Sequence, residues 1–279
     1  MRKIILLDNG SLQASATLTL RSLAKNLENA IQRPVDAVSL QHANKILPDA
    51  LNGTRATILS EYLAEQLGNG QRQFVLLPLF FGLNRALTTK VPELIKDLTA
   101  THADFELCIA DVLYPLPAGD AQLEQVLKQN IQVTPRNGAE MPRHVVLVDH
   151  GSPSIRVNEV RQRLARSLQR SLQDGCTVSQ AAMERRPGKQ YDFNRPLLED
   201  WLLTQPGKGI DSVLLCLLFL LPGRHAGPGG DIESICQRVN RQYPNFDIQV
   251  SPLVSDNPGL IKILKARAQS CLDQGEKKL

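Results

Sequence analysis

Aromatic residues and cysteines are scarce in this chain. Only 4% of its 279 residues are aromatic and no dense lysine or arginine run occurs, so the stacking surfaces and basic tracts typical of nucleic-acid-binding proteins are missing. The five cysteines are scattered singly without CxxC spacing, which argues against a disulfide framework and against a thiolate metal site. No apolar run approaches the length of a membrane span. We therefore expect a cytoplasmic protein with no nucleic-acid and no membrane partner.

The N-terminus is also short of the features of a signal peptide. Its basic start and apolar stretch end at Asp8 and Asn9, and no small-residue cleavage site follows, so we interpret residues 3–8 as a β-strand. The 42% hydrophobic content is enough to bury a core. Positive charge is concentrated in the second half, where 19 Lys and Arg face 14 Asp and Glu, against 13 and 14 in residues 1–140. With nucleic acid disfavoured, this excess suits a small anionic ligand.

One pattern is written twice along the chain. Residues 4–11 and 145–152 each form an apolar run that ends in Asp-x-Gly-Ser, at an offset of 141. Residues 75–81 and 214–220 match each other at an offset of 139. Two matches in the same order at nearly the same offset indicate an internal duplication.

Short apolar runs alternate with amphipathic stretches in both halves, which is typical of parallel strands covered by helices. The patterns predict α/β architecture with two similar doubly wound parallel-sheet domains, 1–132 and 143–279, joined by a turn-rich linker at 133–142. The expected strands are 3–8, 35–39, 73–80, 105–110, 144–149, 177–183, 211–219 and 246–251. The expected helices are 12–31, 55–68, 89–99, 120–130, 155–173, 194–204, 229–242 and 257–272.

Two histidines follow predicted strands of the second half. His150 comes directly after strand 144–149, and His225 lies in a glycine-rich loop after strand 211–219. Ligands of open parallel sheets bind outside the carboxyl ends of the strands, so both imidazoles are candidates for one crevice. Neutral imidazole binds divalent iron, cobalt and nickel. The alternatives are a histidine that caps its turn and an incidental histidine in a surface loop.

Other polar residues follow the same strands. Glu184 ends strand 177–183 and is a candidate third ligand or proton acceptor, or else a surface carboxylate paired with a neighbouring arginine. Guanidinium groups match carboxylates in bidentate geometry, so the basic cluster suits a ligand edged with acid groups, although a solvated basic face is the competing interpretation. The glycines of the second loop allow close approach of a bulky ligand, but they do not form a nucleotide-binding motif. The basic cluster comprises Arg185, Arg186, Lys189, Arg195 and Arg224.

These residues together resemble the sirohydrochlorin cobaltochelatase and ferrochelatase family, the class II chelatases. The resemblance rests on the strand followed by Asp-His-Gly-Ser, on a carboxylate after the next strand, and on Leu-Phe-Leu-Leu-Pro-Gly-Arg-His-Ala-Gly-Pro-Gly-Gly-Asp-Ile at 218–232. It implies a tetrapyrrole held in a crevice between two similar domains. It also implies that His150, His225 and Glu184 act as metal ligands and proton acceptors. Substrate contacts are expected from Arg185, Arg186, Arg224, Ser152 and Gly227.

The first half departs from this pattern. Asn9 stands where His150 does, Ala86 where His225 does on an ungapped alignment, and Val112 where Glu184 does. The ligand set is therefore expected in the second half alone.

The resemblance implies an ATP-independent lyase that inserts a divalent metal into sirohydrochlorin in cobalamin or siroheme biosynthesis. The metal is Co²⁺ or Fe²⁺, with Ni²⁺ as a further candidate. The metal is then a substrate, no nucleotide is needed, and the protein is expected to be a monomer or a weak homo-oligomer. A non-catalytic tetrapyrrole or metal carrier derived from a chelatase is the alternative. A periplasmic-type receptor is disfavoured because no export signal is present.

Overall fold

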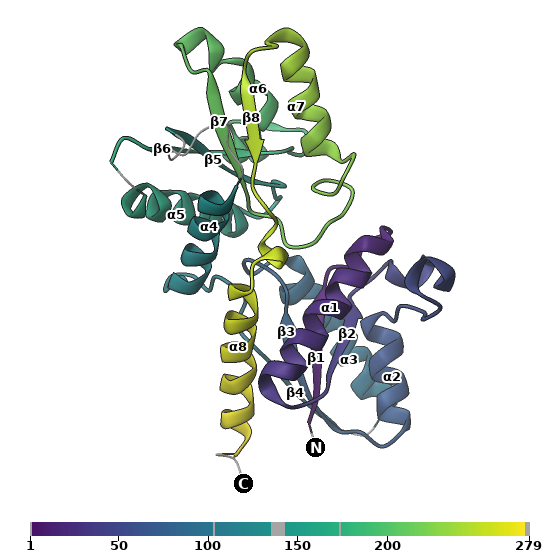
Figure 1. The fold of residues 1–279 in the computed structure, drawn as a ribbon. Coiled ribbons are helices and arrows are strands. Elements are labelled where there is room, and N and C mark those ends of the chain that lie inside the picture. Colours follow the sequence, from purple (N-terminus) through teal and green to yellow (C-terminus); the bar gives the residue numbers. More distant parts are fainter. Residues whose placement is uncertain (1, 103, 135–142, 173, 277–279) are drawn as a thin grey trace. The chain divides into compact units, whose positions relative to one another are not determined.

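Two compact units make up the chain in a computed structural model, which describes all residues except 1, 103, 135–142, 173 and 277–279 (Figure 1). The first unit comprises Met1–Asp120 and Leu260–Leu279, and the second unit comprises Ala121–Gly259. Each unit contains a four-stranded parallel sheet.

The sheet of the first unit has the strand order β2-β1-β3-β4. Its β1 pairs with β2 on one side and with β3 on the other, with Ile4 opposite Val35 and Val75. The elements are β1 Lys3–Asp8, α1 Ala14–Ile31, β2 Val35–Ser39, the 3₁₀ turns Ala43–Lys45 and Pro48–Leu51, α2 Leu59–Gly68, β3 Gln73–Pro78, a π-helical turn η3 Ala86–Lys90, α3 Val91–Thr101 and β4 Glu106–Ile109.

The second unit repeats this topology in the order β6-β5-β7-β8. Its elements are α4 Ala121–Val133, β5 His144–Asp149, α5 Ile155–Ser171, β6 Thr177–Ala182, the 3₁₀ segments η4 Lys189–Asn194 and Pro206–Lys208, α6 Leu198–Leu203, β7 Ser212–Leu217, α7 Asp231–Gln242, β8 Asp247–Val250 and the 3₁₀ turn η6 Val254–Asp256. The last helix, α8, spans Gly259–Glu276.

The central strands form because their side chains are apolar on both faces. Residues 4–7 of β1 and residues 145–148 of β5 are at most 1% exposed, as expected of parallel strands covered by helices on both sides. In the second unit the core extends from β5 and β7 to Leu198 of α6 and Val239 of α7. The two similar doubly wound sheets predicted from the sequence are confirmed.

Strand order defines where a ligand is expected. The chain leaves β1 toward β2 and then crosses to β3 on the other side, so the order reverses between β1 and β3, and likewise between β5 and β7. Open α/β sheets bind ligands at this switch point, beyond the carboxyl ends of the strands. In the second unit the switch point lies between the strands that precede His150 and His225.

The predicted elements agree with the observed ones within four residues: α2 and α6 each begin four residues later than expected, and α8 ends four residues later. The helix expected at 194–204 begins only at Leu198, and a 3₁₀ segment ends at Asn194. Pro196 explains the break, because a proline disfavours helical backbone in the residue that precedes it. Most of the predicted linker, 135–142, lies outside the described residues.

The compact units differ from the sequence halves 1–132 and 143–279 by an exchange of helices. Helix α4 follows the last strand of the first sheet but belongs to the second unit, whereas nearly all of α8 follows the last strand of the second sheet and belongs to the first. The Lys128 Nζ of α4 donates to the Ser171 carbonyl at 2.8 Å. The Arg267 Nε of α8 donates to the Val112 carbonyl at 3.2 Å. Each unit is thus completed by a helix from the other repeat.

A disulfide also ties α8 to the first unit. Cys108 of β4 is bonded to Cys271 of α8, at a sequence separation of 163. The expectation that the scattered cysteines form no disulfide is wrong for this pair, because the helix exchange brings together two residues that are remote in the sequence. Within the described residues, no helix combines the length and apolar character that a membrane span requires.

Candidate functional site

The end of β5 turns sharply to expose His150. Gly151 has a φ of +89°, and a Cβ at this position would lie 2.0 Å from the Glu184 carbonyl oxygen. Only glycine fits so tight a turn with positive φ. The turn is also closed by the Glu184 N–H, which donates to the His150 carbonyl at 3.1 Å. The local geometry therefore places the residue that follows β5 beside the residue that follows β6.

The imidazole of His150 is partly exposed and has partners at both nitrogens. Its Nδ1 lies 2.9 Å from the Gly151 carbonyl oxygen, which is a pure acceptor, so Nδ1 carries the proton in the neutral ring. Its Nε2 lies 3.2 Å from Glu184 Oε1. Both atoms are acceptors when unprotonated, so a proton or a metal ion between them would bind Nε2 and the carboxylate together, and both are candidate ligands.

His225 reaches the same place from the loop after β7. The two imidazole centroids are 4.4 Å apart at an interplanar angle of 63°. Its Nδ1 lies 2.6 Å from Asp231 Oδ2, at the first residue of α7. A carboxylate at one nitrogen fixes the tautomer and turns the other nitrogen toward a metal, as in many metal sites. The structure therefore brings His150, His225 and Glu184 together, as the sequence predicted.

This cluster has the donor types that first-row divalent metals prefer, namely imidazole nitrogen and carboxylate oxygen. Among the residues that the structure describes, no group of three His, Cys, Asp or Glu side chains is arranged to hold a metal ion. The cluster is a pair of imidazoles with a carboxylate against each, partly open to solvent. Such an arrangement suits a metal that is bound transiently and passed on.

Two glycines in the loop after β7 are required by the backbone conformation of that loop. A Cβ at Gly227 would lie 2.7 Å from the Gly223 carbonyl oxygen, and a Cβ at Gly230 would lie 2.8 Å from three backbone oxygens. These positions need glycine because the chain folds closely on itself around His225. The observed contacts thus explain why glycine stands at 227 and 230.

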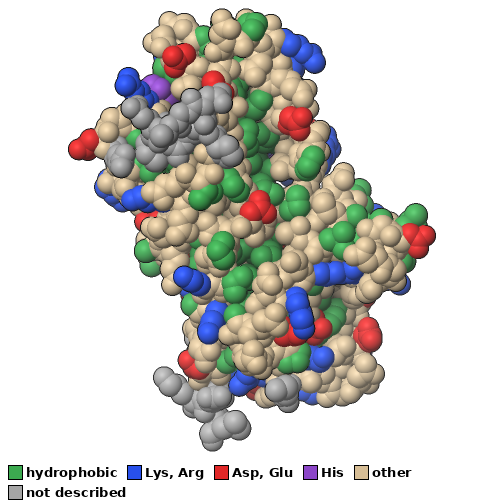
Figure 2. All heavy atoms as spheres, viewed as in Figure 1, with side chains coloured by type: hydrophobic (Ala, Val, Ile, Leu, Met, Phe, Trp, Pro, Cys, Tyr) green, Lys and Arg blue, Asp and Glu red, His purple; other side chains and the backbone are tan. Residues whose placement is uncertain are grey.

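The basic residues expected to contact substrate fall into two groups. The Arg185 guanidinium donates to the carbonyls of Arg186 and Gly188 at 3.1 Å, and it is engaged with its own loop. Arg224 is 78% exposed, with its Nε 3.7 Å from Asp231, beside His225. On the face shown in Figure 2, basic side chains are dispersed among acidic and uncharged ones. Arg224 shares Asp231 with His225.

Ser152 contributes through its backbone. Its N–H donates to Asn194 Oδ1 at 3.0 Å, and its carbonyl accepts from Asn194 Nδ2 at 2.9 Å. Sequence reasoning missed both Asn194 and Asp231. Asp231 lies six residues after His225 in the same motif, so the sequence could have indicated it as a partner. Asn194 is brought to the turn only by the fold.

The first unit has no imidazole at the matching strand end. Asn9 is exposed at the end of β1, and Ala86 is buried at the start of η3. The assignment of Val112 as the counterpart of Glu184 is wrong. A Cβ at Gly10 would lie 1.7 Å from the Gln41 carbonyl, as one at Gly151 would from that of Glu184, so Gln41 is the counterpart. Val112 follows β4, which is not the neighbour of β1.

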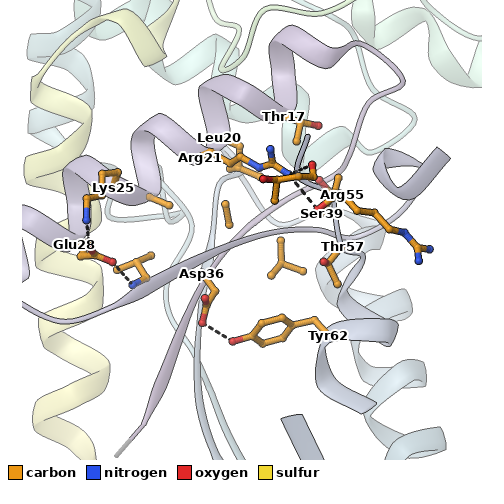
Figure 3. A pocket seen from close by; sticks show the side chains of 16 residues that line it. Thr17, Leu20, Arg21, Lys25, Glu28, Asp36, Ser39, Arg55, Thr57 and Tyr62 are labelled. Atoms are coloured by element: carbon orange, nitrogen blue, oxygen red, sulfur yellow. Dashed lines mark hydrogen bonds and ion pairs between the residues drawn. The ribbon is translucent and has the colours of Figure 1, made fainter. Parts of the chain in front are cut away.

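A hollow in the first unit is no competing site (Figure 3). Its charged side chains bind its own walls: Arg21 donates to the carbonyls of Leu51 and Thr54 at 3.0 and 2.8 Å, and Tyr62 donates to Asp36 at 2.5 Å. The hollow lies along α1 and the edge strand β2, away from the switch point.

The thiols of the second unit are no better candidates as ligands. Burial raises the pKa of Cys216 to about 12 and that of Cys236 to about 11, so both stay protonated at neutral pH.

Comparison with known proteins gives a family match for the half that carries the histidines. Residues 144–271 match the family model described as CbiX. The match lies entirely within the second half of the chain. The match covers both histidines and Glu184, and it confirms the resemblance inferred from the sequence. No curated protein sequence matches at a significant level.

Solved structures share the fold over nearly the whole chain. SirB from Bacillus subtilis with Fe³⁺ aligns with a TM-score of 0.68 at 15% identity, covering 99% of this chain and 98% of SirB. The sirohydrochlorin chelatase SirB from Bacillus subtilis subspecies spizizenii in complex with cobalt gives 0.68 at 14%, with the same coverage. CbiX, the terminal enzyme for biosynthesis of siroheme in denitrifying bacteria, gives 0.59 at 13%, covering 96% and 99%. The chelatase fold therefore includes the first half, which the CbiX model does not reach.

Proposed function

We propose that this protein is an ATP-independent lyase that inserts Co²⁺ or Fe²⁺ into sirohydrochlorin. The observation that carries the proposal is the pair of imidazoles, 4.4 Å apart at the switch point of the half that the CbiX model matches. The structural neighbours support it, since SirB is described as a sirohydrochlorin chelatase and CbiX as an enzyme of siroheme biosynthesis.

Each residue of the cluster has a role in this proposal. The Nε2 atoms of His150 and His225 hold the incoming metal ion, which is a substrate. Insertion of a divalent ion releases two pyrrole protons, and Glu184 or an imidazole that has released the metal accepts them. Arg224 and Arg186 offer guanidinium groups to the peripheral carboxylates, and Arg185 does so with the part of its guanidinium that does not bond its own loop. Ser152 and Gly227 shape the adjoining loops.

Anaerobic incubation with sirohydrochlorin and Co²⁺ or Fe²⁺, followed by visible absorbance, tests the proposal. Turnover beyond one equivalent of protein is expected, without nucleotide. The double variant His150→Ala/His225→Ala is the matched blank. Stoichiometric binding of tetrapyrrole or metal without turnover would favour the non-catalytic carrier.

Assembly and location are part of the same proposal. We expect a monomer or a weak homo-oligomer in the cytoplasm, with a tetrapyrrole as its partner. Sedimentation over a concentration series tests the assembly, and cell fractionation tests the location.

A further inference from the structure

A fully buried arginine lies beneath the turn that carries His150. Arg161 of α5 is 0% exposed, and its guanidinium is bonded to the Asp149 carboxylate. Its Nε donates to Gln180 Oε1 at 3.0 Å, and its Nη2 donates to the Asn194 carbonyl at 3.3 Å. The guanidinium therefore connects the end of β5 to β6 and to the segment that precedes α6.

Two of its partners hold the turn on either side of the imidazole. Asp149 Oδ1 accepts the Gly151 N–H at 3.1 Å. The Asn194 side chain bonds both the N–H and the carbonyl of Ser152. The backbone of 151–152 is thus fixed by groups that Arg161 itself holds in place.

The first unit shows that the fold does not require this arginine. The offset of 141 that aligns Asp8 with Asp149, and the start of α1 with that of α5, places Leu20 opposite Arg161. Leu20 is 1% exposed, and the same sheet and helix form around it. There, Asp8 Oδ1 is buried without a hydrogen-bond partner. A buried charge is costly to desolvate, and the arginine is found in the unit that has the histidines.

We propose that Arg161 is a positioning residue for metal insertion. Through Asp149 and Asn194 it fixes the 150–152 turn so that His150 Nε2 meets the incoming ion together with His225. It does not contact the ion. This inference rests on the proposed function.

Three variants test it against a merely structural role. Arg161→Leu introduces the residue that the first unit has at the matching position, Leu20. Asp149→Asn/Arg161→Leu removes both buried charges at once. Arg163→Leu, which breaks the Arg163–Glu159 surface pair at 2.9 Å on the same helix, is the matched control. The measurements are kcat, KM for sirohydrochlorin, the visible spectrum of bound Co²⁺, and the denaturation midpoint, at a temperature where circular dichroism shows all variants folded.

Arg161→Leu is expected to lower kcat at least tenfold with a smaller change in KM, whereas Arg163→Leu stays within twofold. The double variant should regain most of the denaturation midpoint, because no buried charge is left unpaired. It should not regain kcat. The Co²⁺ spectrum of both Arg161 variants should match that of His150→Ala.

The double variant also distinguishes a positioning role of Arg161 from simple neutralisation of the Asp149 charge. Recovery of both stability and kcat, or a wild-type Co²⁺ spectrum in Arg161→Leu, would mean that Arg161 only neutralises Asp149. A wild type that binds Co²⁺ but inserts none would overturn the proposed function, and the spectra would still decide the role of Arg161. A wild type that binds no Co²⁺ would overturn both.

Discussion

The first and second units contain the same sheet, but the chain leaves their strands differently. After β7 the long segment Leu218–Gly230 carries His225, whereas after β3 only Leu79–Arg85 precedes a π-helical turn whose first residue is the buried Ala86. The apolar strand β1 of the first unit and its counterpart β5 in the second unit are equally buried. The comparison shows that similar cores maintain the same fold while the segments beyond the strand ends present different side chains at the switch point.

Replacing either histidine tests this contrast, and it should have the largest effect on the rate of metal insertion. His150→Ala or His225→Ala should lower the rate of metal insertion by about 10²–10⁴-fold, because each removes a ligand and a candidate proton acceptor. Asn9→Ala, at the matching strand end, should stay within twofold. Initial rates by absorbance measure all three. A comparable loss in Asn9→Ala would assign chemistry to the first unit as well.

Asp149 precedes His150, and Asp8 precedes Asn9. Replacing each by asparagine should change the free energy of unfolding in opposite directions. Asp149→Asn leaves Arg161 buried and unpaired, so it should lower the free energy of unfolding by about 3–5 kcal/mol. Burial raises the pKa of Asp8, where no arginine opposes it. Asp8→Asn should therefore raise the free energy of unfolding at pH 7.

The sign of the Asp8 effect depends on pH. Because the pKa of Asp8 is raised in the folded state, its neutral form stabilises the fold at low pH, and this contribution is lost as pH rises through the folded pKa. The advantage of Asp8→Asn should vanish near pH 4 or below, close to the unfolded pKa of about 3.9. Urea unfolding at several pH values measures it. A pH-independent difference would contradict the assignment of the effect to this carboxyl.

The disulfide lies in the first unit, so removing it should lower the stability of that unit. Cys108→Ser/Cys271→Ser should lower the free energy of unfolding of the first unit by about 2–4 kcal/mol, since the bond closes a long loop. Cys176→Ser, in the second unit, is the control. Thermal unfolding with and without reductant measures the difference. Equal loss in the control would show a general sensitivity to cysteine replacement.

The smallest expected effect concerns charge near the histidines. Arg224→Ala should raise KM for sirohydrochlorin a few-fold, about 1 kcal/mol, and weaken its dependence on salt, because an exposed cation attracts the acid rim through solvent. Lys208→Ala, a basic residue in a 3₁₀ turn elsewhere in the second unit, is the control. An unchanged KM across the salt series would leave Arg224 as part of a solvated face.

Hydrophobic periodicity was sufficient to predict the sheets, and the Asp-x-Gly-Ser repeat predicted the duplication. The convergence of His150 and His225 followed from a general rule about strand ends. The side chains that hold the turn around His150 did not follow, because Asn194 and Arg161 reach Ser152 and Asp149 through tertiary packing. The Val112 error has another origin: Glu184 follows the second strand of its half, whereas Val112 follows the fourth strand of the other half, so the strand order already indicated the segment after residues 35–39.

The exchange of α4 and α8 has a consequence for how the molecule can be divided. A protease cut within 135–142 would leave an N-terminal piece that carries a helix of the second unit and a C-terminal piece that carries a helix of the first. Neither piece holds a complete unit, so the two would have to reassociate to rebuild either one. Fusion of two half-length chains, each lending its last helix to the other as in a domain-swapped pair, would produce this arrangement.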